Sequence, residues 1–287
     1  MFGFYFCFIM SGVLVILALV PLFKKIPTPP RIKHTYHASS ITSDILKDSN
    51  LLNMIIINAM QKGLMTIAFV LIPIILISKD FAWEKSDIYM AYLPAMIFGL
   101  VAMGPAAVFG EKKNKPKEMF LISIVMFIGS FLFMGLTNSS TFFVVGVVMF
   151  FFGFNMMEPL VQSMITKFAT VQQKWCALGI TNSIAYFMTF IDGTFTGLML
   201  DISDTGTIGL SIAGISTLLL LWTLKLQNPT KYAHLYLPQD SINMMNLEAL
   251  EHEHIAEWYI NENEALVVVK YVASAMESDE LKAKIAK

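Results

Sequence analysis

Long apolar stretches separated by short polar segments dominate the first 225 residues. Seven of them approach the roughly 20 apolar residues that a helix needs to cross the hydrocarbon layer of a membrane: 1–23, 51–77, 88–109, 119–137, 142–166, 177–200 and 207–224. Helices are expected because only helices and closed barrels satisfy their own backbone hydrogen bonds in lipid. The pattern predicts an all-α polytopic membrane bundle of seven transmembrane helices.

The pattern changes after Lys225. "YAHLYL" alternates like a strand, and Asp240 or Ser241 can cap a helix through "INMMNLEALE". "IAEWYI" and "ALVVVKYV" flank a polar "NENE" turn, as in a hairpin, and Ser278 to Ile285 can form a short helix. Residues 225–287 are therefore predicted to be a linker and a small α/β domain. A domain of this size is marginally stable alone, which favours docking on a larger body.

Composition supports a membrane protein, because 56% of residues are hydrophobic and 14% are charged, against about a quarter charged in soluble domains. The net charge of −1 gives no basic excess, so no nucleic-acid partner is expected. One set of alternate loops carries Lys24, Lys25, Arg31, Lys33, Lys47, Lys112, Lys113, Lys115, Lys117, Lys167, Lys174, Lys225 and Lys231. The opposite set carries only Lys79 and Lys85. Basic loops favour the cytoplasm, so the C-terminus is expected there.

An odd number of spans then leaves residue 1 on the outer side with no leader to bring it there. We therefore expect this chain to be the later part of a longer protein.

Polar residues recur on one face of the fifth span, where Asn155, Glu158 and Gln162 follow the spacing i, i+3, i+7. Exposure of this polar face to lipid would be energetically unfavourable. Two interpretations of Glu158 stay open: a carboxylate hydrogen-bonded between helices for packing, and a functional group on a transport pathway. In the second span, Asn58 and Lys62 are one turn apart. Lys62 can reach toward the cytoplasmic headgroups, or it can be the countercharge of a carboxylate.

The sixth span carries Thr189, Asp192 and Thr196 at the same spacing. A charged group near the bilayer centre costs about 3 kcal/mol, so Asp192 should face a cavity or a partner. We favour a cavity-facing, titratable Asp192 that can carry a proton. The alternative is an aspartate that pairs with a neighbouring helix and has only a structural role. Gly193 and Gly197 offer a face of small residues for close helix packing.

Residues 153–183, "GFNMMEPLVQSMITKFATVQQKWCALGITNS", resemble the tenth helix, the following loop and the start of the eleventh helix in YajR-like drug-efflux proteins of the major facilitator superfamily. "FVLIP" at 69–73 is similar to their seventh helix, and "IAEWYINENEALVVVKY" resembles their C-terminal ferredoxin-like domain. Glu158 matches a glutamate of the family's "FNxxE" segment, whereas related sequences tend to have a small residue in place of Asp192.

The resemblance implies a division of the chain into four parts. Residues 1–23 correspond to the sixth helix of a twelve-helix transporter, 24–50 to the cytoplasmic linker between its halves, 51–224 to the six-helix C-terminal bundle, and 225–287 to the linker and tail domain. The N-terminal bundle would be missing. "GPAAVFGEKKNKPKE" is a degenerate copy of the family's cytoplasmic loop motif: Gly110, Lys112 and Lys113 stand at matching places, but Ala107 replaces the expected acid. An ion pair built on that acid is doubtful here.

The expected function is the C-terminal portion of a secondary transporter in the inner membrane, which exports small amphipathic compounds by alternating access coupled to protons. The alternative is a non-transporting membrane protein with a regulatory or ligand-sensing tail. An enzyme is not expected, because the catalytic signatures HExxH and G-x-S-x-G are absent. No metal or cofactor is expected either, because "EHEH" at 251–254 lacks the CxxC loop of metal-binding domains that the tail resembles.

Overall fold

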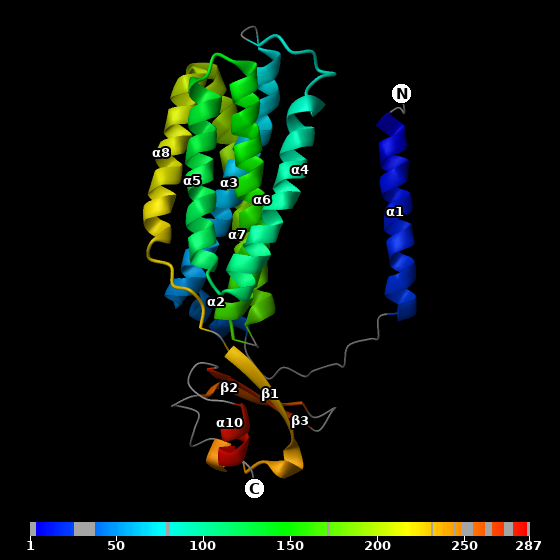
Figure 1. Cartoon of the computed structure of the whole chain (residues 1–287), viewed down its shortest axis with the longest axis vertical. Coiled ribbons are helices and arrows are strands. Elements are labelled where there is room, and N and C mark those ends of the chain that lie inside the picture. The colour runs from blue at the N-terminus through cyan, green and yellow to red at the C-terminus, as the bar shows by residue number, and fades with distance from the viewer. Residues whose placement is uncertain are drawn as a thin grey trace.

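The computed structural model describes residues 4–25, 38–78, 81–170, 173–230, 232–243, 245–247, 255–261, 266–272 and 278–285. Within these residues, six helices are long and apolar enough to cross a membrane. They are α3 (Ser49–Ile77), α4 (Tyr89–Pro105) with its π-helical continuation η1 (Ala106–Lys112), α5 (Pro116–Leu136), α6 (Ser140–Phe168), α7 (Lys174–Ile202) and α8 (Thr205–Thr223). They run alternately up and down in one bundle (Figure 1), which confirms the six spans predicted between 51 and 224.

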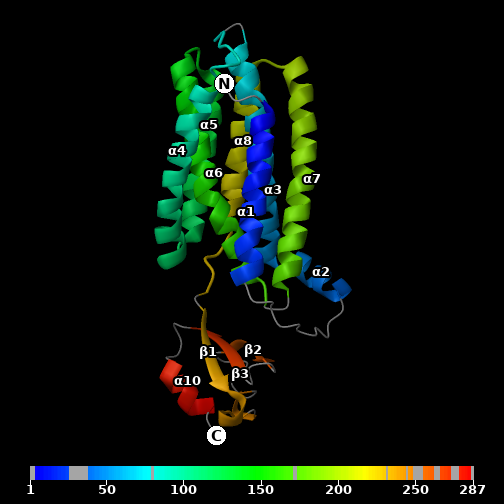
Figure 2. The same cartoon turned by 90° about the vertical axis from the view of Figure 1, so that its right-hand side faces the viewer.

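The first predicted span also forms a helix, α1 (Phe4–Lys25), but it stands apart from the bundle (Figures 1 and 2). Its side chains are exposed at both ends, with Tyr5 at 84% and Phe23 at 81%. Its apolar part, Phe8–Pro21, is shorter than the six membrane-length helices, so a seventh span stays a prediction. The predicted linker contains a short helix, α2 (Ala38–Lys47), and 26–37 lie outside the described residues.

Local sequence signals fix where the bundle helices begin. Asp48 precedes α3, and its Oδ1 accepts hydrogen bonds from the backbone N–H groups of Asn50 (2.8 Å) and Leu51 (2.9 Å). Pro116 opens α5, where its missing N–H costs nothing. Asp204 precedes α8 and accepts from the N–H of Thr207 at 3.0 Å. These caps satisfy N–H groups that a helix start otherwise leaves without a partner.

The bundle core is built mainly from α3, α5 and α6, and α6 packs against α5, α4 and α3. Buried phenylalanines contact one another between α5 and α6: the ring centroid of Phe150 lies 5.3 Å from that of Phe127 and 5.7 Å from that of Phe131. The remaining helices pack in pairs, α7 on α3 and α8 on α5.

Two glycines set the closest approach of α5 and α8. A Cβ on Gly135 would lie 2.8 Å from the Cα of Gly209, so neither position has room for a side chain. The close packing expected at Gly193 and Gly197 is not found. A Cβ at Gly193 would make only an ordinary contact, 3.4 Å from Thr66, and one at Gly197 would meet no described atom within 4 Å.

The tail contains an antiparallel sheet of order β1-β3-β2, made of β1 (Tyr232–Pro238), β2 (Ile255–Asn261) and β3 (Leu266–Val272). A short helix, α10 (Ser278–Ile285), packs on the sheet through Leu281 and Ile285. The predicted first strand, hairpin strands and last helix are confirmed. After β1 come the 3-10 turn η2 (Gln239–Ser241) and helical residues 245–247. The remainder of the predicted helix to residue 251, "EHEH" and most of the "NENE" turn lie outside the described residues, and a ferredoxin-like fold stays a prediction.

The segment between α8 and β1 is tied to the start of α5. The side-chain amide of Asn114 donates to the carbonyl of Pro229 (2.7 Å), and Lys117 Nζ donates to the carbonyl of Leu224 (2.7 Å). The backbone N–H of Lys117 donates to Asn228 Oδ1 at 3.0 Å. The tail therefore follows the bundle at the end where the lysine-rich loop before α5 lies (Figure 2).

Candidate functional site

An ion pair joins α3 to α6 inside the bundle. Lys62 Nζ lies 2.6 Å from Glu158 Oε1, and the two side chains are 13% and 31% exposed. The other carboxylate oxygen, Oε2, accepts a hydrogen bond from Gln61 Nε2 at 3.0 Å. Lys62 Nζ also lies 5.5 Å from the centre of the Phe154 ring. Of the two alternatives for Lys62, the geometry matches the countercharge, and the carboxylate that it faces is Glu158.

A second polar group connects α3 and α6 to α7. Asn58 is fully buried, and its Nδ2 donates to Asn182 Oδ1 (3.2 Å) and to the carbonyl of Thr181 (3.4 Å). Gln162 Nε2 donates to the same Asn182 oxygen at 3.3 Å. Asn182 was missed by the sequence analysis. Its signal was available, because Asn182, Thr189 and Thr196 recur every seven residues on one face of α7.

Two acceptors in this region are buried and receive no hydrogen bond from any described residue: Asn58 Oδ1 and Gln61 Oε1. A buried polar atom without a partner costs about 1–3 kcal/mol. Three helices thus bring together two charges and four amides, and part of their hydrogen-bonding capacity is left unused. Such a cluster can accept further hydrogen bonds, because two of its buried oxygens have no donor among the described residues.

Asn155 does not join this cluster, although it shares a helix with Glu158 and Gln162. Its Nδ2 donates to the carbonyl of Phe151 in its own helix at 2.9 Å, and a Cβ on Gly99 of α4 would collide with it. Asn155 therefore lies at the contact of α4 and α6.

Asp192 lies on α7, against the backbone of α3 at Gly63, where an added Cβ would overlap its carboxylate. No described residue donates a hydrogen bond to this carboxylate, and no described cation lies within ion-pair distance. Thr196 donates to the backbone carbonyl of Asp192 (2.6 Å), and Thr189 donates to that of Tyr186 (2.6 Å). Both threonines are thus satisfied within their own helix.

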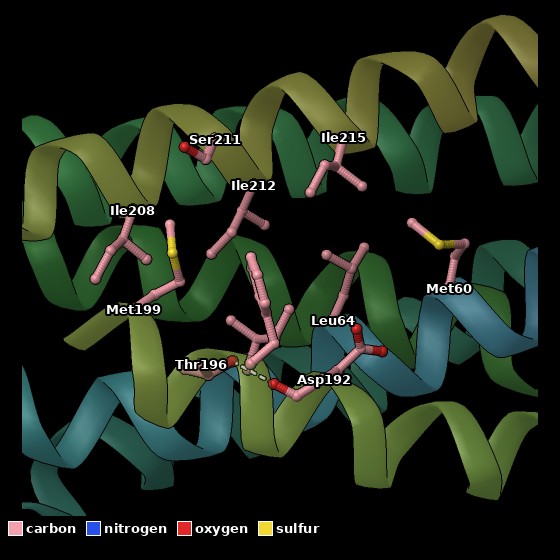
Figure 3. Close-up of a pocket in the computed structure, with 11 residues that line it drawn as sticks. Met60, Leu64, Asp192, Thr196, Met199, Ile208, Ser211, Ile212 and Ile215 are labelled. Atoms are coloured by element: carbon pink, nitrogen blue, oxygen red, sulfur yellow. Dashed lines mark hydrogen bonds between the residues drawn. The ribbon is translucent and has the colours of Figure 1, made fainter. Parts of the chain in front are cut away.

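The Asp192 side chain borders a pocket of about 60 Å³ between α3, α7 and α8 (Figure 3). The pocket is lined by Met60, Leu64, Ile67, Asp192, Phe195, Thr196, Met199, Ile208, Ser211, Ile212 and Ile215. The structure therefore places Asp192 at a cavity that is otherwise largely apolar.

The loop motif lies at the end of α4, where the helix widens into η1. A Cβ on Gly110 would collide with Leu160 of α6, so glycine permits this approach. Lys113 Nζ lies over the ring of Phe109 at 4.4 Å, and Lys112 ends η1 with an exposed side chain.

An ion pair is present at this loop despite the loss of the expected acid. Glu111 Oε2 lies 2.6 Å from Lys167 Nζ at the end of α6. Glu111 follows Ala107 by four residues, about one helical turn, so a different residue supplies the negative charge. Residue spacing did not predict this pair, because its two members are 56 residues apart in the chain.

Comparisons with known proteins agree with this architecture. The family described as Major Facilitator Superfamily matches residues 1–193. The chain is also similar to the protein named Inner membrane transport protein YajR from Escherichia coli (strain K12), with 26% identity over 198 residues. That alignment covers 67% of this chain and 43% of the relative. The chain thus spans less than half of the length of the curated relative that it matches.

Proposed function

The chain belongs to the major facilitator superfamily, a family of membrane transporters, and on that premise we propose that it is the C-terminal bundle of a YajR-like, proton-coupled efflux transporter. The ion pair between Lys62 and Glu158 is the observation that carries the proposal. The proposed substrates are small amphipathic compounds, which move through the membrane by alternating access. A second helix bundle of the same protein completes the pathway.

The proposed coupling follows from the cost of charge in a membrane. A paired lysine and glutamate are tolerated there, whereas a lone charge costs about 3 kcal/mol. A proton on Glu158 would cancel its charge, leave Lys62 without a countercharge and weaken the hydrogen bond that Oε2 accepts from Gln61. The bundle would then relax toward an arrangement in which Lys62 meets water or another partner. Proton binding and conformation are thereby linked, as an antiporter requires.

In the proposed orientation, the protein lies in the inner membrane, and its lysine-rich end and its tail lie in the cytoplasm. Helix α2, the η1 loop and the tail then share one side (Figure 1). The Glu111–Lys167 pair would stabilise the closed cytoplasmic end of this bundle.

Substrate uptake into inverted membrane vesicles, which reports efflux because the cytoplasmic face is outside, tests the coupling. The chain is expressed together with the proposed preceding bundle. Glu158→Gln keeps the side-chain size but cannot release a proton, so we expect the pH dependence of efflux to disappear and the rate to fall at least about tenfold. Asp192→Asn is compared in parallel, because Asp192 is the second candidate proton carrier. Asp201→Asn, at an exposed site on the last turn of α7, is the control. An unchanged pH profile in Glu158→Gln would place the coupling elsewhere.

A further inference from the structure

We propose that the pocket at Asp192 is a binding site for a single-chain alkylammonium ion that enters from the bilayer between α7 and α8. The inference rests on the proposed function only in treating this ligand as a class of transported substrate, and binding itself does not depend on transport. The site lies on α3, α7 and α8 and does not include the Lys62–Glu158 pair.

The walls of the pocket select an apolar body. Eight of its eleven lining residues are Met, Leu, Ile or Phe, contributed by all three helices. A pocket volume of about 60 Å³ leaves no room for a multi-ring compound, whereas the end of one alkyl chain can enter it. Met60 and Met199 lie at different ends of the pocket (Figure 3), and their flexible side chains can adapt to chains of different shape.

The polar residues of the pocket leave one group available for a ligand. The hydroxyl of Thr196 donates to the carbonyl of Asp192, and the hydroxyl of Ser211 donates to the carbonyl of Thr207 at 2.8 Å. The Asp192 carboxylate, by contrast, receives no hydrogen bond from any residue in the described part of the chain. A carboxylate accepts hydrogen bonds and carries negative charge. It therefore selects a cation with N–H donors, which an alkylammonium ion provides.

Nearby cations do not compete for Asp192. Lys62 precedes Gly63, the residue that Asp192 touches, but its Nζ is 2.6 Å from Glu158. Gly63 itself matters because any side chain there would push the carboxylate away from α3. An uncompensated carboxylate within a membrane is unfavourable, and a bound ammonium group would offset that cost.

The pocket borders two residues that are exposed on the surface of the bundle, a surface that we expect to face the bilayer. Phe195 of α7 and Ile215 of α8 line it and are 52% and 40% exposed. The two helices that carry them make their main contacts elsewhere, α7 with α3 and α8 with α5. An alkyl chain can therefore remain partly in the hydrocarbon layer while its ammonium group reaches Asp192.

Photolabelling of the purified chain in nanodiscs of zwitterionic lipid tests the site. The probe is a long-chain alkylamine with a diazirine in its chain, and the alcohol of the same length is the neutral control. We expect the amine to label peptides of α7 and α8 around the pocket, and the alcohol to do so far more weakly. Labelling should fall about tenfold in Asp192→Asn, a factor that corresponds to 1.4 kcal/mol.

Three further variants make the result decisive. Asp192→Glu keeps the charge and should retain labelling, which separates loss of charge from loss of folding. Gly63→Ala displaces the carboxylate and should reduce labelling, whereas Asp201→Asn should not. Equal labelling by amine and alcohol, or full labelling of Asp192→Asn, overturns the site. Because labelling requires no transport, it can succeed where the pH profile of Glu158→Gln refutes the proposed coupling, and it can fail where that profile supports it.

Discussion

At the scale of single residues, the polar positions followed helical spacing, but their partners could not be deduced from it. The sequence marked Lys62, Glu158 and Asp192, and it left open whether Lys62 faces a carboxylate. The structure pairs Lys62 with Glu158, because α3 packs against both α6 and α7 and the two carboxylates lie toward different neighbours. Gly63 gave no signal in the sequence, since its role depends on a contact with a helix 129 residues away.

A double-mutant cycle measures what the ion pair contributes to stability. Lys62→Met and Glu158→Gln each leave one partner unpaired in the bundle, so each should lower the free energy of unfolding by about 2 kcal/mol. The double variant removes both charges and should recover most of that loss. Thermal unfolding in detergent is the measurement.

Lys284→Met provides the comparison for this cycle. Its pair with Glu280 is short, 2.9 Å, but lies on the exposed face of α10, so its removal should have little effect. Equal stability of the parent and both single variants would show that water screens the Lys62–Glu158 pair and that it stores no energy for a conformational change.

At the scale of elements, apolar length alone predicted the six bundle helices, and their ends agree with the structure to within a few residues. Spacing failed where helices approach closely: the small-residue face at Gly193 and Gly197 is not used, and Gly135 meets Gly209 instead. Contacts of this kind depend on which helices become neighbours. The π-helical turn η1, which packs against α5 and α6, was likewise not predicted, because apolar length carries no information on the hydrogen-bond pattern within a helix.

The start of α8 offers a pH-dependent test of helix capping. Hydrogen bonds from the hydroxyl (2.6 Å) and the backbone N–H (3.0 Å) of Thr207 hold the pKa of Asp204 below its usual range. A lowered pKa in the folded state means that the cap stabilises the protein above the ordinary aspartate pKa of about 3.9 and loses this effect as the pH falls through the folded value. Asp204→Ala should therefore unfold at a lower temperature than the parent at neutral pH, and the difference should shrink in acid.

Asp201→Ala is the control for the cap, because its carboxylate receives no hydrogen bond from a described residue. It should show no comparable dependence on pH. If the difference between the parent and Asp204→Ala persisted unchanged at acid pH, the Asp204 carboxylate would not be the source of the stabilisation.

At the scale of the whole molecule, the lysine-bearing ends of α2, η1 and α6 lie at the same end of the bundle as the tail (Figure 2). The charge pattern predicted this grouping, since alternate loops must share a side of the membrane. The docking details could not be predicted, because Asn114 and Lys117 bond to backbone groups more than 100 residues away. The position of α1 also could not be deduced, because no polar residue between Phe4 and Phe23 except Ser11 distinguishes one face of the helix from another.

The chain on its own should lack a complete transport pathway. In the proposed mechanism, substrate crosses between two bundles, and the described residues provide one bundle and α1, whose described side chains are exposed. The 287-residue chain reconstituted alone in liposomes should therefore show no flux that a proton uncoupler abolishes, although it should still bind the alkylamine probe. Co-reconstitution with the proposed N-terminal bundle should restore flux, and Glu158→Gln should remove its pH dependence. Uncoupler-sensitive flux from the chain alone, in liposomes that hold one copy each, would refute the two-bundle mechanism, because a single bundle would then contain the whole pathway.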